Sequence, residues 1–159
     1  MSEEERPLEG RKHPSELQPG EELTPCEFVV SPQMVNFFLI GIDDRSPWYR
    51  TSSPFGAPIM PPVMIHMGST RLRAWHLWGD YLGAVLVKPS GVHTVFDVEN
   101  IDPVRIGEKV TMRGKVIQNY IKRGRRYLDY EMTMFGEDGR LCHRYISTTM
   151  YGYGEKEES

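Results

Sequence analysis

The stretch that decides the fold is KVTMRGKVIQNYIKRGRRYLDYEMTMFGEDGRLCHRYISTTMYGY, which occupies residues 109–153. Lys109–Ile121 and Arg126–Phe135 are rich in Val, Ile, Tyr, Met and Thr, which favour extended strands. The basic segment between them predicts a hairpin, and Asp138-Gly139 predicts a second hairpin through a type I′ turn. A last strand is expected over Leu141–Tyr153. Three strands joined in this way form an antiparallel sheet.

The residues that precede this stretch predict a further strand at each end of a helical region. Apolar residues alternate with polar ones over 91–98, and Phe28–Val30 is also strand-like. Ser31-Pro32 caps a helix that ends at Gly41, and Pro61-Pro62 opens a longer helix with apolar positions at helical spacing up to Gly79. Residues 42–62 hold five of the twelve prolines and must be irregular. The chain is therefore α+β, and the far face of its sheet needs a cover or a partner subunit.

Length and composition indicate one globular domain. The chain has 159 residues, 39% hydrophobic and 26% charged, with a formal net charge of −3, which disfavours nucleic acid as a partner. No apolar run reaches the roughly 20 residues of a membrane span, and no secretory signal is visible, so a cytoplasmic protein is expected. Cys26 and Cys142 alone make neither a disulfide framework nor a metal site. We expect a flexible arm over residues 1–22, a single domain over 23–153 and a flexible tail over 154–159.

Four motifs, in this order and spacing, resemble the MaoC-like hotdog family of (R)-specific enoyl-CoA hydratases and dehydratases. They are GIDDRSPWY (41–49), PFGAPIMPP (54–62), NIDPVRIGE (100–108) and the Asp-Gly pair at 138–139. The resemblance covers about residues 22–153 and is strongest to the branch of MaoC-like dehydratase N-terminal domains. It implies a hotdog fold, in which an antiparallel sheet wraps a long central helix. It also implies a dimer that binds acyl-CoA between two units, with coenzyme A as part of the substrate and no separate cofactor.

The family's catalytic pair maps incompletely onto this chain. When the motif is aligned on Pro47, the family's Asp falls on Asp44 and its His falls on Tyr49. Hydration of an enoyl thioester needs a base for water and an acid for the α-carbon. Tyrosine, with a pKa of about 10, is a poor base near neutral pH. Asp44 can still orient water, or it can merely cap a turn or pair with Arg45 or Arg50.

The helix start departs from the family pattern as well. The hydratases have a Gly there whose N–H holds the thioester carbonyl, and this chain has Pro62, which has no N–H. The next backbone donors belong to Val63 and Met64. His66 follows one turn later and is a candidate for the missing imidazole, although a lone helix histidine is more often structural.

Several residues are candidates for substrate binding. Trp48 and Tyr49 would line the acyl tunnel or pack in the core, and Gly56 lies in the same proline-rich loop. Arg123 and Arg125 belong to the run KRGRR, which would either hold coenzyme A phosphates or form a solvated hairpin tip.

The expected function is that of a MaoC-like hotdog subunit in enoyl-CoA hydration or dehydration, which is a lyase reaction. Either this chain has a divergent site of its own, or it shapes the acyl pocket while a partner hotdog subunit supplies Asp and His. The alternatives are a hotdog acyl-CoA thioesterase and a non-catalytic acyl-CoA binding protein.

Overall fold

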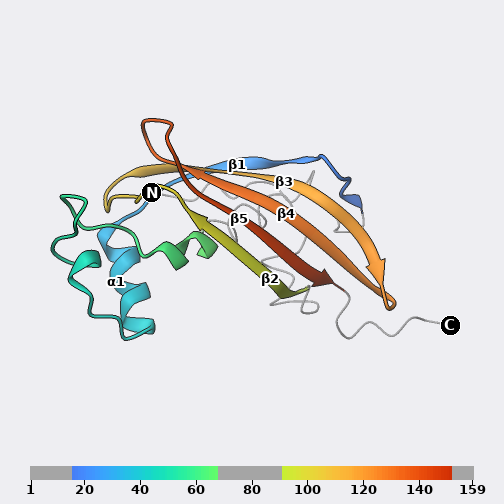
Figure 1. The fold of residues 1–159 in the computed structure, drawn as a ribbon, viewed down its shortest axis with the longest axis horizontal. Coiled ribbons are helices and arrows are strands. Elements are labelled where there is room, and N and C mark those ends of the chain that lie inside the picture. The colour runs from blue at the N-terminus through green and yellow to red at the C-terminus, as the bar shows by residue number, and fades with distance from the viewer. Residues whose placement is uncertain (1–15, 68–90, 152–159) are drawn as a thin grey trace.

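The computed structural model describes residues 16–67 and 91–151, and its main element is a five-stranded antiparallel sheet (Figure 1). The strands lie in the order β1-β3-β4-β5-β2, so β1 and β2 form the two edges. Their bounds are β1 Glu22–Val29, β2 Gly91–Asn100, β3 Lys109–Lys122, β4 Arg125–Phe135 and β5 Leu141–Tyr151. The α+β class and the antiparallel sheet predicted from the sequence are confirmed.

Helix α1 (Pro32–Gly41) begins and ends where the sequence predicts. The Ser31 hydroxyl accepts a hydrogen bond from the Met34 N–H at 3.2 Å, and proline occupies the first turn, where its missing N–H costs nothing. Val35 and Leu39 are buried against the sheet, whereas Phe37 is 76% exposed. The helix therefore buries only a narrow stripe and leaves an apolar outer face.

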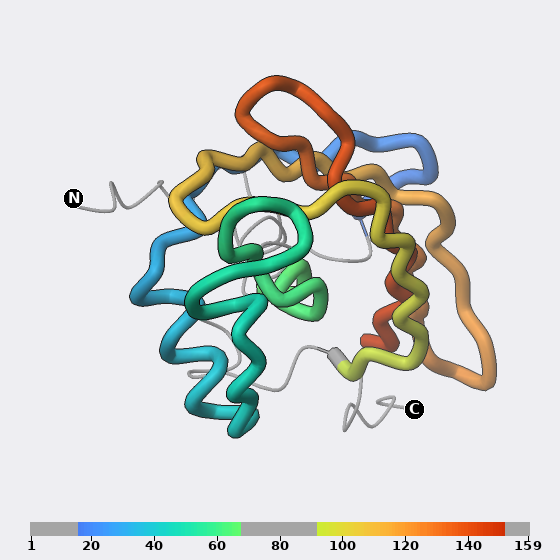
Figure 2. The backbone as a smooth tube through the Cα atoms, turned by 60° about the vertical axis from the view of Figure 1, so that its left-hand side comes forward, coloured from blue at the N-terminus to red at the C-terminus, as the bar shows by residue number. Residues whose placement is uncertain are grey.

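The second helix begins as expected, with the 3₁₀ turn η3 (Pro62–Met64) and helical residues 65–67. Met64 and Ile65 are buried in the core. Figure 2 shows this segment inside the curve of the sheet, between α1 and the β2 edge. The continuation of the helix toward Gly79 lies outside the described residues.

The inner face of the sheet is a methionine-rich core. Alternate residues of β3 and β4 are buried, as strand geometry requires. Tyr130 and Tyr151 are also buried there, with their hydroxyl oxygens 3.2 Å apart. The buried members of β3 and β4 are Val110, Met112, Val116, Leu128, Tyr130, Met132 and Met134. The sheet and the helix start therefore bury each other.

The folded part begins before the boundary expected at residue 22. Leu17 is fully buried, although the sequence places it in the N-terminal arm. The Gly20 N–H donates to the Val116 carbonyl at 2.8 Å, and the Glu21 carbonyl accepts from the Val116 N–H at 2.8 Å. These bonds continue the pairing of β1 with β3, so residues 17–21 are held by backbone contacts that composition does not reveal.

A type I′ turn occurs in the β3–β4 hairpin and not, as the sequence predicts, at Asp138-Gly139. Arg123 (φ 53°) and Gly124 (φ 72°) both have positive φ, as a type I′ turn between β3 and β4 requires. In the β4–β5 connection Gly139 has φ 82°, but Asp138 does not have positive φ. The Asp138 carboxylate instead accepts a hydrogen bond from the Arg140 N–H at 3.1 Å. The prediction of a type I′ turn at Asp138-Gly139 is wrong, because this side-chain bond stabilises a different turn.

Candidate functional site

The candidate site lies at the end of the molecule that carries α1 and the irregular loop over residues 42–61 (Figure 1). The loop is tied to the segment before β3. Ile59 forms an isolated bridge with Arg105, and the Met60 N–H donates to the Val104 carbonyl at 2.8 Å. The loop is therefore fixed by backbone bonds to the segment that leads into β3.

Asp44 forms part of a turn. One carboxylate oxygen accepts a hydrogen bond from the Ser46 N–H at 2.8 Å. The backbone carbonyl of Asp44 accepts from the Arg50 guanidinium at 3.0 Å. This geometry fits the structural role that the sequence left open for Asp44, namely capping of a turn.

The aromatic residues of the loop divide into a buried and an exposed set. Tyr49, at the end of η2 (Pro47–Tyr49), is half-buried and packs against the core. Trp48 is 45% exposed and meets Phe55 edge-to-face, with ring centroids 6.5 Å apart. Gly56 has φ 86°, a conformation that favours glycine, so its role in this loop is to form the bend. The loop thus presents an exposed aromatic pair, while Tyr49 is engaged in packing.

The first turn of the second helix offers fewer donors than the sequence suggested. The Met64 N–H donates to the Pro61 carbonyl at 2.9 Å, so it is not available to bind a thioester carbonyl. The Val63 N–H is then the donor of this turn that a thioester carbonyl can use, because Pro62 has none. The side chain of Val63 is 52% exposed.

His66 contacts strand β2. Its ring lies 4.8 Å from the ring of His93 and 5.6 Å from that of Phe96, both in edge-to-face geometry. His93 Nδ1 in turn lies 3.1 Å from the hydroxyl oxygen of Ser147 on β5. The sequence motifs do not single out His93 or Ser147, because strand pairing alone brings these residues together.

The β3–β4 hairpin, which carries Arg123 and Arg125, lies at the opposite end of the sheet from α1 and the loop that follows it (Figure 1). Strand β3 has 14 residues, and at about 3.3 Å per residue it places its two ends roughly 40 Å apart. Arg125 lies with Nη1 3.8 Å from the Met150 sulfur, and Arg126 donates to the Asn119 side chain at 2.6 Å. The structure does not bring the basic hairpin together with the loop of Asp44 in one chain.

Two further reactive side chains of β5 are buried. His143 is 2% exposed, and its Nδ1 lies 2.9 Å from the side-chain oxygen of Asn100. Burial lowers the pKa of His143 to about 4, so the ring is neutral at physiological pH. Burial also raises the pKa of the Cys142 thiol, which makes it a poor nucleophile.

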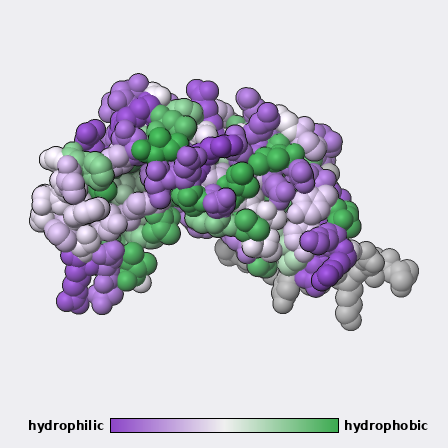
Figure 3. Space-filling model, in the orientation of Figure 1, coloured by the Kyte–Doolittle hydropathy of each residue, from purple (hydrophilic) through white to green (hydrophobic). Residues whose placement is uncertain are grey.

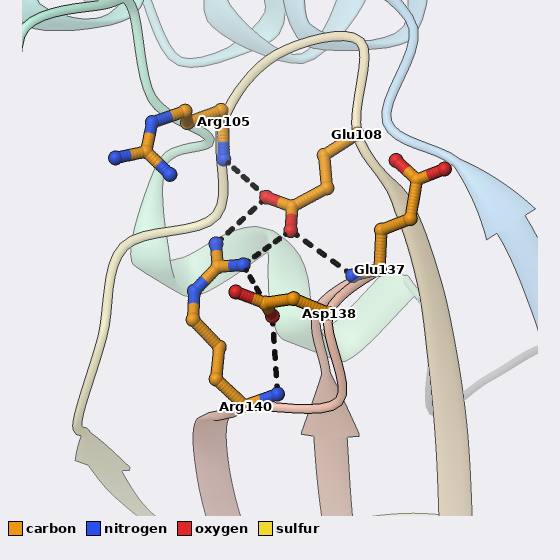
Figure 4. A pocket seen from close by; sticks show the side chains of 5 residues that line it. All are labelled: Arg105, Glu108, Glu137, Asp138 and Arg140. Carbon is orange, nitrogen blue, oxygen red and sulfur yellow. Dashed lines mark hydrogen bonds and ion pairs between the residues drawn. The ribbon is translucent and has the colours of Figure 1, made fainter.

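A pocket of about 400 Å³ lies between the β4–β5 turn and the segment before β3, and three of its charged side chains, Glu108, Asp138 and Arg140, are paired with one another (Figure 4). Arg140 binds both carboxylate oxygens of Glu108, at 2.6 and 2.8 Å, and Asp138 at 2.9 Å. Burial alone would raise the pKa of Glu108, but the hydrogen bonds from Arg140 and from the backbone N–H groups of Arg105 and Glu137 outweigh it and lower the pKa. This network is structural. The described residues contain no group of three or more His, Cys, Asp or Glu side chains arranged to hold a metal ion.

Hydrophobic and hydrophilic residues are interspersed over the face seen in Figure 3. Within residues 16–67 and 91–151, no helix has the length and apolar character that a membrane crossing requires.

Comparison with known proteins finds similarity at the level of structure. No protein-family model matches the chain, and no curated protein sequence matches it. The HadBC (3R-hydroxyacyl-ACP dehydratase) complex from Mycobacterium tuberculosis aligns with a TM-score of 0.70 at 16% identity, over 86% of this chain and 98% of that chain. The (R)-hydratase from A. caviae involved in PHA biosynthesis aligns with a TM-score of 0.65 at 16% identity, over 84% and 96%. The MaoC-like dehydratase from Rhodospirillum rubrum aligns with a TM-score of 0.65 at 13% identity, over 85% and 92%. These matches confirm the hotdog fold.

Proposed function

We propose that the chain is a MaoC-like hotdog subunit that binds an acyl-CoA thioester and takes part in hydration or dehydration of enoyl-CoA, with a second hotdog unit completing the pocket. The observation that carries the proposal is the fold, shared over most of both chains with a dehydratase complex and an (R)-hydratase. The motifs GIDDRSPWY and PFGAPIMPP support it, because they form the fixed loop and the helix start beside the sheet.

The thioester carbonyl would be held at the start of the second helix. The Val63 N–H is the donor there, at the positive end of the helix, where charge that develops on the carbonyl oxygen is stabilised. The exposed Trp48–Phe55 pair supplies an apolar surface for the acyl chain.

Asp44 and Tyr49 do not act as an acid–base pair in this proposal. One oxygen of Asp44 holds the Ser46 N–H, and Tyr49 packs against the core. Proton transfer must therefore come from other residues of this chain or from a partner. The similarity to a complex of two different subunits, HadBC, supports a hotdog partner.

The test is product analysis with trans-enoyl-CoA, first with the full chain alone and then with its hotdog partner. Reversible addition of water with an intact thioester supports the proposal. Release of free thiol would instead indicate a thioesterase, and binding without a reaction in both arms would indicate a binding protein.

Two substitutions test the mapped positions within the same assay. Tyr49→His should raise hydration little, because Tyr49 packs against the core and the Asp44 carboxylate is engaged in its turn. Pro62→Gly should raise it more, because it adds a second carbonyl donor beside the Val63 N–H, and one oxyanion donor accounts for about 10²–10³ in rate. An equal effect of the two variants would show that Pro62 does not limit carbonyl binding.

A further inference from the structure

Two tyrosines are stacked near the tip of the β3–β4 hairpin, at the end of the sheet far from α1 (Figure 1). Tyr120 on β3 lies directly opposite Tyr127 on β4. Their ring centroids are 5.4 Å apart, and the ring planes are inclined by only 11°. Both residues are half-buried, and neither belongs to the hydrophobic core. The hairpin therefore carries a flat aromatic surface that the packing of the core does not require.

A bulge in β3 turns Tyr120 to the outer face of the sheet. Two steps along β3, from Val116 to Gln118, correspond to one step along β4. The extra residue shifts the alternation, so the residues that follow it point to the face opposite to the one that unbroken alternation gives. Tyr127 points outward, because its neighbour Leu128 is fully buried on the inner face. Tyr120 lies opposite Tyr127 and shares its face, so the bulge assembles the stacked pair outside the core.

Positive charges adjoin the stacked pair on the same face. Lys122 follows Tyr120 by two residues, so it lies on the outer face one step nearer the tip. Arg123 forms the tip itself, and Arg125 lies opposite Lys122. The side chains of Lys122 and Arg123 are exposed, and in the part of the chain that the structure describes neither forms an ion pair. These two cations are therefore available to an anionic ligand.

One carboxylate lies on this face as well, and it is directed away from the tip. Asp129 pairs with Gln118, which precedes Lys122 by four residues, or about 13 Å along the strand. Its carboxylate accepts a hydrogen bond from the Thr148 hydroxyl at 2.7 Å. Asp129 is thus held toward β5, and it leaves the charges of the tip uncompensated.

A flat ring system that carries phosphates matches this surface. Aromatic side chains bind nucleobases by stacking, and lysine and arginine bind phosphate oxygens through charge-assisted hydrogen bonds. Lys122 lies one strand period, about 7 Å, from Tyr120, a separation that the ribose of a nucleotide bridges. A purine covers more of a tyrosine ring than a pyrimidine does, because it has two fused rings.

We propose that the outer face of the β3–β4 hairpin binds a purine nucleotide, with the base stacked on the Tyr120–Tyr127 pair and the phosphates held by Lys122 and Arg123. The nucleotide is either free or the nucleotide end of coenzyme A. In the second case the acyl end reaches the site of a second hotdog unit, because the candidate site of the same chain lies at the opposite end of the sheet (Figure 1). The inference goes beyond the proposed function, since it holds whether or not the chain takes part in hydration.

The experiment is a calorimetric titration of the full chain with ADP, with coenzyme A and with pyrophosphate. Tyr127→Ala should weaken nucleotide binding by about 5–150-fold, the effect of removing one stacking aromatic residue. Tyr127→Phe should restore binding, because it keeps the ring. Phe135→Ala, at the other end of β4 and beneath the guanidinium of Arg113, is the matched control and should leave the affinity unchanged. Pyrophosphate, which has no base, should bind more weakly than the nucleotide.

The charges are tested in the same titration. Lys122→Ala and Arg123→Asn should each weaken nucleotide binding more at low salt than at high salt, because salt screens exposed charges. Asparagine tolerates the positive φ of residue 123, so this variant keeps the turn. Lys115→Ala, on the outer face in the middle of β3, is the control for loss of a charge and should have little effect. Thermal unfolding of every variant checks that it folds.

The results distinguish the two sources of the nucleotide. Similar affinities for ADP and coenzyme A support a site for free nucleotides, whereas binding of coenzyme A alone, weakened by Tyr127→Ala, supports its nucleotide end as the ligand. Binding of neither ligand, or equal binding of pyrophosphate and ADP, overturns the inference. Tighter binding of single-stranded oligoadenylate than of ADP also overturns it, because the face would then recognise a nucleic acid. Coenzyme A binding that Tyr127→Ala leaves unchanged overturns it too, and leaves the proposed function standing.

Discussion

At the residue scale, Gly136 lies where a methyl group has no room. A Cβ at this position would lie 2.5 Å from both Arg140 Nη1 and Glu108 Oε1, the atoms of the partly buried ion pair. Gly136→Ala should therefore lower the free energy of unfolding by about 1–3 kcal/mol, measured by urea denaturation. Gly41→Ala is the matched control, since its Cβ would meet nothing within 4 Å. That variant should be neutral or stabilised by up to about 1 kcal/mol. Equal effects of the two substitutions would contradict the crowding argument.

His143 should make stability depend on pH. In the folded chain its pKa is lowered to about 4 by burial, whereas the unfolded side chain titrates near 6.5. Below pH 6.5 the unfolded state takes up a proton that the folded state does not. The free energy of unfolding therefore falls from pH 6.5 toward pH 4, by roughly 3 kcal/mol in all, and the contribution is fully present above pH 6.5.

The measurement compares wild type with His143→Leu between pH 4 and pH 7. The free energy of unfolding of the wild type should fall relative to that of the variant as the pH falls, because the variant lacks this group. A difference between the two proteins that stays constant over this range would show that His143 takes up its proton over the same pH range in the folded and unfolded states.

At the scale of elements, the β3–β4 hairpin has a residue in an unfavourable conformation. Arg123 has φ 53°, where asparagine is better tolerated than arginine, and asparagine followed by glycine is the favoured type I′ pair. Arg123→Asn should raise the free energy of unfolding by roughly 0.5–1 kcal/mol. Lys122→Asn, one residue earlier and without positive φ, should give no gain in the same denaturation measurement.

The charged side chains of this hairpin can meet coenzyme A phosphates only at a site that a second hotdog unit completes, because one chain does not bring them to the loop of Asp44. Arg125→Ala should weaken binding of an acyl-CoA more at low salt than at high salt, as measured by calorimetry, because salt screens exposed charges. Lys115→Ala, in the middle of β3, is the control and should have little effect at either salt concentration. Equal affinities of Arg125→Ala and wild type at both salt concentrations would show that the tip of the hairpin is solvated and does not contact coenzyme A.

The sequence predicts the regular elements well, because their signals are local. The alternation over β3 and β4 and the Ser31-Pro32 cap of α1 each lie within one segment. Leu17 is different, because it is held by a contact with Asn119 of β3. The turn at Asp138 is local, but a side-chain hydrogen bond sets its type, and the Asp-Gly pair alone does not predict that bond.

The same limit applies to the candidate site. The motifs identify the loop of Asp44 and the helix start, and they identify His66 as a candidate imidazole. They do not identify its neighbours, because His93 and Ser147 meet through the pairing of β2 with β5 and a bulge within it. A bulge changes which face a side chain occupies, and alternation in the sequence does not show where it occurs.

At the scale of the whole molecule, the exposed apolar residues of the edge strand β2 indicate that the protein self-associates or binds a partner protein. Val92, Val95 and Phe96 on this strand are 43%, 49% and 40% exposed, and within residues 16–67 and 91–151 no further strand pairs with its outer side. We expect at least a dimer at micromolar concentration by light scattering. Val95→Lys should weaken it, whereas Ile121→Lys, at the far hairpin, should not. A stable wild-type monomer would contradict this prediction.

The order of the strands along the chain is the order in which the ribosome synthesises them, and it differs from their order in the sheet. Both edge strands, β1 and β2, leave the ribosome before the three central strands β3, β4 and β5 to which they attach. Strand β1 pairs with β3, more than eighty residues later, and at about 5–20 residues per second it waits several seconds for its partner. Strand β1 can pair once β3 has emerged, whereas β2 must wait for β5, the last strand of the sheet. A nascent chain of this protein therefore carries β2 unpaired until β5 has been synthesised, which is the interval in which chaperones would matter most.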